Sequence, residues 1–163
     1  MTTNQFTSRH AVWVTTTFFA LCLYCFGAGT MDSFVVYHTW RFIGAEEFSL
    51  AHMESGSRIV PIFVLPMVVM TAFLILMFWH RPTVISRKML WISLICTIIP
   101  WLSSAFIQIP MQFQLDSGKD VALLNQLITT DWIRVIPHWV LIGVVLTMLA
   151  RCLKSSQRHP SAV

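Results

Sequence analysis

More side chains suited to acid–base chemistry lie in residues 32–58 than in any other interval of similar length. This interval holds the ionisable residues Asp32, His38, Arg41, Glu46, Glu47, His52, Glu54 and Arg58 and the aromatic residues Phe34, Tyr37 and Trp40. His38 and His52 are candidate catalytic bases, because an imidazole changes its charge near neutral pH. The mixture of ionisable and aromatic residues indicates a structured amphipathic segment, and we expect part of a site in it.

A second group of polar residues interrupts runs that are otherwise apolar. Gln108 and Gln112 lie four residues apart, as do Arg134 and His138, so each pair shares one face of a helix. Asp131 precedes Arg134 by three residues and could pair with it while the guanidinium keeps N–H groups for a carbonyl or anionic ligand. An apolar slot and a further cation would come from Trp40, Trp101, Trp132 and Arg41. Together these residues predict an outward-facing substrate pocket in which Arg134 acts beside a histidine base.

A simpler interpretation is that these residues anchor the chain at a membrane interface. Arg41 and Arg134 could extend into lipid headgroups, and His38 and His52 could be solvated. Arg134 and His138, however, enter an apolar run, and ionisable groups inside a membrane usually face the protein interior or a water-filled cavity. For any one of these residues taken alone the interfacial anchor is the favoured interpretation, and for Arg134, His138 and Gln108 together the pocket is favoured.

The elements that must position these residues are membrane-spanning helices. The chain is 56% hydrophobic and only 11% charged, with a mean hydropathy of +0.69, which is too apolar for an ordinary soluble domain. Apolar runs long enough to cross a bilayer fall at residues 11–31, 59–79, 89–110 and 133–153. Because lipid offers no partner for backbone N–H and C=O groups, these runs should be helices. The sequence predicts an all-α fold: one integral membrane domain, a four-transmembrane-helix bundle with an amphipathic extracytoplasmic cap between the first two helices.

Charge placement predicts the orientation. Basic residues without acidic neighbours flank one end of the predicted spans: Arg9, Arg81, Arg87, Lys88, Arg151, Lys154 and Arg158. All seven acidic residues fall at the other end. The positive-inside rule then places both termini in the cytoplasm, as expected for a bacterial inner-membrane protein. The net charge of +4 is explained by contact with anionic lipid and requires no nucleic acid.

A signal peptide over residues 1–31 is a competing interpretation, although the apolar run is longer than the usual apolar core of a signal peptide.

The Cys22-Leu-Tyr-Cys25 motif lies near the middle of the first span. In a soluble protein this spacing suggests redox or zinc chemistry. Within a membrane helix the two thiols are more simply interpreted as small apolar packing groups. No cysteine is predicted on the outer side, which disfavours a disulfide-forming enzyme.

Metal and haem binding remain open alternatives, and the sequence names no cofactor. His38, His52 and His138 could bind copper together with a carboxylate, although their spacing matches no recognised ligand motif. Haem b would require two histidines at matching depth on different helices, and His138 is the one that clearly lies inside a predicted span. A non-catalytic subunit of a larger membrane complex, or a homo-oligomer, would equally use the many Phe and Met side chains at lipid-facing or partner-facing surfaces.

The order of these parts resembles the small four-helix membrane family that includes the anthrone oxygenases of aromatic polyketide pathways. The Asn-x-Pro-x-Asn end of helix three in that family is matched here by Gln108-Ile-Pro-Met-Gln112. The Trp-led entry to helix four is matched by residues 131–138, which contain Trp132, Arg134 and His138. Glutamine replaces the usual asparagine, and the arginine that often closes the helix-four motif has no counterpart.

The resemblance implies oxidation of an activated aromatic carbanion by O2 without an obvious cofactor. Such a reaction needs a base for a C–H proton, donors for the resulting enolate and an apolar slot for flat rings. His52 or His38 would be the base, and Arg134 and Gln108 would be the enolate donors. The slot would be formed by Trp101, Trp132 and Trp40.

Overall fold

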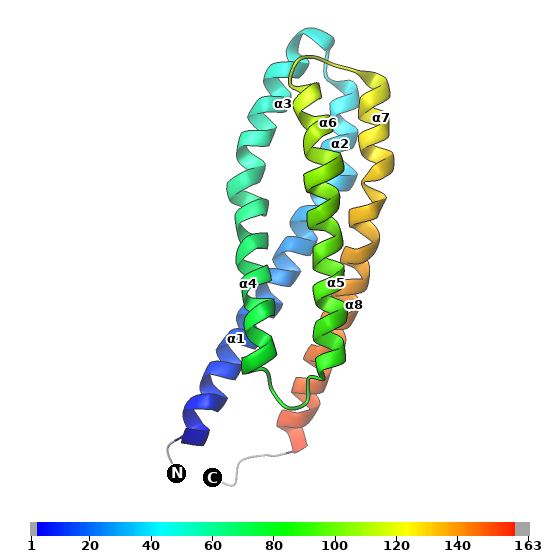
Figure 1. The fold of residues 1–163 in the computed structure, drawn as a ribbon. Coiled ribbons are helices and arrows are strands. Elements are labelled where there is room, and N and C mark those ends of the chain that lie inside the picture. Colours follow the sequence, from blue (N-terminus) through cyan, green and yellow to red (C-terminus); the bar gives the residue numbers. More distant parts are fainter. Residues whose placement is uncertain (1–2, 159–163) are drawn as a thin grey trace.

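The computed structural model describes residues 3–158, and these residues are helical throughout apart from short turns (Figure 1). The first half contains α1 (Thr3–Met31), η1 (Asp32–Val36), α2 (Tyr37–Thr39), η2 (Trp40–Phe42), α3 (Ala45–Ile59), η3 (Val60–Val64) and α4 (Leu65–His80). The second half contains α5 (Arg87–Ser103), η4 (Ser104–Gln108), α6 (Ile109–Leu115), α7 (Val121–Thr130) and α8 (Trp132–Arg158). Four continuous helical stretches are long and apolar enough to cross a membrane: Arg9–Phe42, Ala45–His80, Arg87–Leu115 and Val121–Gln157. The predicted all-α, four-helix fold is confirmed.

The four long helices form a bundle in which α1 packs on α4 and α8, and α5 packs on α8 and α4. The start of α1, the end of α8 and the turn at residues 81–86 lie at one end of the bundle, and the turns at 43–44 and 116–120 lie at the other, here called the distal end (Figure 1). The basic clusters and the acidic residues therefore occupy opposite ends. Cys22 and Cys25 are each 2% exposed and pack as free thiols in the main apolar core.

The amphipathic cap predicted between the first two spans is not confirmed as an element of its own, because residues 32–58 form the ends of two long helices. Residues 32–42 prolong α1, and α3 runs without a break through η3 into α4. A second apolar cluster holds these ends against α6 and α7; it contains Tyr37, Trp40, Phe48, Met111, Leu115, Leu124 and Leu127. Burial of one face of each helix end makes the interval rigid without a separate element.

The turn at 116–120 is closed by side chains as well as backbone. Gly118 has a φ of 149°, a conformation that side-chain-bearing residues rarely adopt. Asp120 caps the amphipathic helix α7 by accepting from the backbone N–H groups of Ala122 and Leu123. Lys119 donates to the carbonyl oxygens of Arg41 and Ile43 at 2.9 and 2.6 Å. The two distal turns are thereby tied together.

Three of the long helices contain a π-helical segment: η1 in the first, η3 in the second and η4 in the third. Prolines accompany two of them, Pro61 and Pro66 around η3 and Pro110 just after η4. Pro66 has no N–H for the carbonyl of Ile62 four residues earlier. The Tyr24 hydroxyl supplies the missing donor at 2.8 Å, so the proline is accommodated by a neighbouring helix.

Candidate functional site

A cavity of about 460 Å³ lies between the second and third long helices, in their distal halves. Its polar lining consists of His52, Ser57, Trp101, Ser104, Gln112, Asp116 and Arg134. Its apolar lining consists of Met53, Gly56, Ile59, Val60, Phe63, Val64, Met67, Ile109 and Phe113. A cavity of this size, mostly apolar with a few convergent polar groups, is typical of small-molecule sites.

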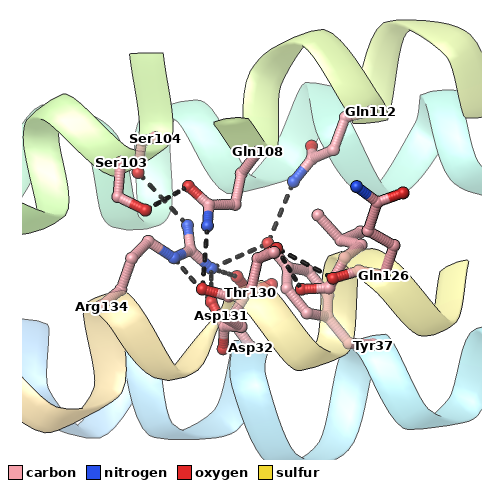
Figure 2. A network of polar contacts seen from close by, with 11 residues as sticks. Asp32, Tyr37, Ser103, Ser104, Gln108, Gln112, Gln126, Thr130, Asp131 and Arg134 are labelled. Atoms are coloured by element: carbon pink, nitrogen blue, oxygen red, sulfur yellow. Dashed lines mark hydrogen bonds and ion pairs between the residues drawn. The ribbon is translucent and has the colours of Figure 1, made fainter. Parts of the chain in front are cut away.

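Arg134 enters this cavity from α8 and is the centre of a buried polar network (Figure 2). Its Nε donates to Oδ1 of Asp131 at 2.6 Å, and its Nη2 donates to the Tyr37 hydroxyl at 2.8 Å. Nη2 also lies 3.7 Å from Oδ2 of Asp32, and Nη1 lies 3.4 Å from the Ser104 hydroxyl. The Arg134 side chain is only 12% exposed. It is therefore part of the bundle interior and does not extend to lipid headgroups.

The contacts of Arg134 depend on the π-helical segment η1. Asp32 and Tyr37 are five residues apart, and at about 100° per residue they would lie roughly 140° apart around an α-helix. In η1 the N–H of Tyr37 instead bonds the carbonyl of Asp32. This i→i+5 bond brings the two side chains onto one face. Both can therefore contact the same guanidinium.

Gln108 and Gln112 take different roles in this network, although both reach its centre (Figure 2). Gln108 is fully buried; its Oε1 accepts from Ser103 at 2.9 Å and its Nε2 donates to the Thr130 carbonyl at 3.4 Å. Gln112 donates to the Tyr37 hydroxyl at 3.0 Å and lines the cavity. Gln112 can contact a ligand, whereas Gln108 connects η4 to the junction of α7 and α8 and does not line the cavity.

His52 occupies the distal side of the same cavity and is oriented by Asp116. Its Nδ1 lies 2.7 Å from Oδ1 of Asp116, and its ring packs against Trp40 and Phe48. The Ser49 hydroxyl donates to the backbone carbonyl of Asp116 and so fixes the turn. His52 is 3% exposed, and no hydrogen-bond partner for its Nε2 is found among the described residues. In the tautomer whose proton lies on Nδ1 and is shared with the carboxylate, Nε2 carries a buried lone pair that has no partner among the described residues.

The structure does not bring several of the predicted residues to this cavity. His38 is half-buried, and Arg41 is exposed and donates to Asn125. Trp132 is 52% exposed and packs on Phe34 on the outside of the bundle. None of these three lines the cavity.

His138 and Trp40 also differ from their predicted roles. His138 lies one turn further along α8 than Arg134, where its neighbour is α1, and it lines a small pocket with Gly29. Trp40 supports His52 from behind and lines a separate cavity. Of the predicted tryptophans, Trp101 alone lines the main cavity, with its Nε1 donating to Thr71 at 3.2 Å.

Four residues of the site were not singled out from the sequence: Asp32, Tyr37, Ser104 and Asp116. Asp116 was counted only among the acidic residues at one end of the spans, and Asp32 and Tyr37 meet only in the π-helical register, which α-helical spacing rules cannot detect. The prolines near the helix interruptions were the available signal for irregular helices.

Among residues 3–158 there is no cluster of three or more His, Cys, Asp or Glu side chains placed to hold a metal ion. His52 and His138 open onto different cavities.

Comparison of the chain with models of known protein families, with curated proteins and with solved structures found no match.

Proposed function

We propose that this protein is a membrane-embedded, oxygenase-like enzyme that acts on a hydrophobic aromatic substrate. The observation that carries the proposal is His52, whose Nδ1 is held by Asp116 while its buried Nε2 has no partner among the described residues. A carboxylate that orients one ring nitrogen leaves the other as a base. The resemblance to anthrone oxygenases in the helix-three and helix-four motifs agrees with this chemistry.

In the proposed reaction, Nε2 of His52 removes a proton from an activated CH2 group between aromatic rings. The enolate oxygen accepts from the Nη1 group of Arg134, which has one hydrogen beyond the bond to Ser104, and from the Gln112 amide. The carbanion adds O2, the peroxide takes the proton back from His52, and loss of water leaves a ketone. One oxygen atom of O2 enters the ketone and the other leaves in water, so no external reductant is needed.

Charge balance supports a paired role for His52 and Arg134. The guanidinium faces two carboxylates, Asp32 and Asp131, and Asp116 lies on the other side of the cavity. This surplus of negative charge disfavours a substrate that arrives as an anion. An enolate formed in place is different, because the proton stays on His52 and the total charge of the site is unchanged. We therefore propose a neutral substrate that is ionised only after binding.

The test is O2 consumption by the protein in lipid nanodiscs with anthrone as the substrate. Wild type should consume O2 faster than empty nanodiscs and form one anthraquinone per O2. His52→Gln should lower the rate by about 100-fold or more, the usual contribution of a general base. His38→Gln is the matched control, because His38 lies on the neighbouring helix and does not line the cavity. Equal loss in both variants, or no rate above empty nanodiscs in wild type, would overturn the proposal.

We also propose that the chain is an integral protein of a bacterial inner membrane with both termini in the cytoplasm. Support comes from the separation of charge between the two ends of the bundle. The cavity then lies in the leaflet away from the cytoplasm.

A further inference from the structure

Gly56 lies inside α3 at a place where the bundle contains two adjoining cavities. It lines the main cavity and also a second cavity of about 220 Å³ between the first and second long helices. Ile59 and Gln112 line both cavities as well. The second cavity extends to Asp32, so both cavities reach the buried polar network.

Nothing in the packing of the chain explains a glycine at this position. A Cβ atom at Gly56 would meet no other atom within 4 Å. Glycine weakens a helix relative to alanine, and α3 gains no close approach of another helix in return. Gly143 faces open space as well, so it is the position of Gly56 in the lining of both cavities that makes the space beside it available to a ligand.

The main cavity also opens sideways between the second and third long helices. Met53, Val60, Ile109 and Phe113 line it and are exposed, Phe113 to 71%. Val60 and Ile109 fall within the apolar runs that cross the membrane. A rim of exposed apolar side chains at this depth faces lipid. A molecule dissolved in the bilayer can therefore reach the cavity without crossing water.

The polar end of the cavity defines the chemistry of that molecule. When Nδ1 carries the proton that it shares with Asp116, Nε2 of His52 is a hydrogen-bond acceptor. The nearby carboxylates outnumber the guanidinium of Arg134 and disfavour an anion. The fitting ligand is a neutral donor with an apolar body.

From these observations we infer that the cavity binds a neutral hydroxyaromatic molecule, which enters from the lipid between α3–η3 and η4–α6. Its hydroxyl group donates to Nε2 of His52, and Gly56 limits the width of the ring system. This inference rests on the site of the proposed function but not on turnover: with its hydroxyl on Nε2 of His52, the molecule takes the place of the CH2 group in the proposed reaction, and a lipid-accessible binding protein would use the same opening. Binding and O2 consumption can therefore fail separately.

The route is tested with two probes in nanodiscs: free naphthol, and a phosphatidylcholine whose acyl chain ends in a hydroxynaphthyl group. Binding is measured from the fluorescence of the naphthol group. Both probes should bind wild type, because the tethered probe can arrive through the membrane. Binding of free naphthol alone would place the entrance on the water side, and binding of neither would overturn the site itself.

Naphthalene and naphthoate should both bind more weakly than naphthol, and tighter binding of naphthoate would overturn the neutral-donor assignment.

The role of Gly56 in limiting the width of the bound ring system is tested with Gly56→Leu. Gly143→Leu is the matched control. Gly143 also lies inside a membrane helix where an added Cβ atom would meet no other atom within 4 Å, and it lines neither cavity. Gly56→Leu should weaken naphthol binding by about tenfold or more, and Gly143→Leu should leave it nearly unchanged. Both variants should keep the wild-type melting temperature or exceed it, since glycine disfavours helix. Unchanged binding in a folded Gly56→Leu protein would overturn the role of Gly56. If that variant fails to fold, Gly56→Ala provides the same comparison.

Discussion

Replacement of Arg134 by lysine should destabilise the protein strongly, although the charge is kept. The guanidinium joins Asp131 at 2.6 Å, the Tyr37 hydroxyl at 2.8 Å and Asp32 at 3.7 Å. A compact ammonium cannot reproduce this planar fork and can reach only part of the set. Hydrogen bonds to charged groups contribute about 1.5–3 kcal/mol each, so loss of one or two gives an expected cost of about 1.5–6 kcal/mol.

Unfolding in mixed micelles, followed by far-ultraviolet circular dichroism during titration with sodium dodecyl sulfate, gives this free energy. Arg58→Lys is the control, because Arg58 pairs with Glu54 at 2.7 Å with both side chains largely exposed. An exposed pair of this kind contributes about 0–1 kcal/mol. If the cost of Arg134→Lys were as small as that of Arg58→Lys, Arg134 would be an interfacial anchor and the buried network would be wrong.

A second measurement separates loss of charge from loss of shape at the same site. Arg134→Met should cost about 3–5 kcal/mol, because it leaves two buried carboxylates without their cation. Adding Asp131→Asn to that variant should recover part of the loss, since one of the uncompensated charges is removed. A double variant as unstable as the sum of the two single variants would indicate that Arg134 and Asp131 do not interact.

Three shorter tests address the fold and its orientation. Tyr24→Phe should lower stability by about 1 kcal/mol in the same titration, because the carbonyl of Ile62 loses its donor; no change would mean that the carbonyl finds another partner. Replacement of Cys22 and Cys25 by alanine should leave O2 consumption and naphthol binding near wild type, since both thiols are packing groups, and a selective loss of activity would restore a redox role. A cysteine at Ser117, in the exposed distal turn, should react in intact cells with a membrane-impermeant maleimide, and protection there would reverse the proposed orientation.

The sequence predicted the four helices because hydropathy and proline or charge boundaries are local properties. Asp120, which caps the helix after the turn at 116–120, is likewise a local feature of the sequence. The cap at 32–58 was not confirmed, because hydrophobic runs locate the apolar part of a helix and not the polar turns that prolong it. The helices accordingly extend beyond the predicted spans by up to a few turns.

The candidate site was only partly predictable. Four of the predicted residues, His52, Arg134, Gln112 and Trp101, line the cavity; their types could be recognised from the sequence, and Arg134 and Trp101 also fall within apolar runs. His138 was misplaced because i,i+4 spacing puts two side chains on one face but one turn apart in depth, where the neighbouring helix differs.

The partners of Arg134 were missed for a different reason. Asp32 and Tyr37 meet only because η1 is π-helical, and the choice between an α- and a π-turn depends on the packing of the whole bundle. Asp116 reaches His52 only because two distal turns are tied together. Such tertiary constraints leave no periodic signal in the sequence.

The most direct test of the central claim is hydrogen–deuterium exchange at the CH2 group of anthrone, measured by proton NMR under nitrogen in D2O. This experiment isolates proton removal by His52 from the later reaction with O2. Wild type in nanodiscs should accelerate exchange over empty nanodiscs, His38→Gln should retain that acceleration, and His52→Gln should lose it. Exchange in His52→Gln at the wild-type rate would show that His52 is not the base and would contradict the account.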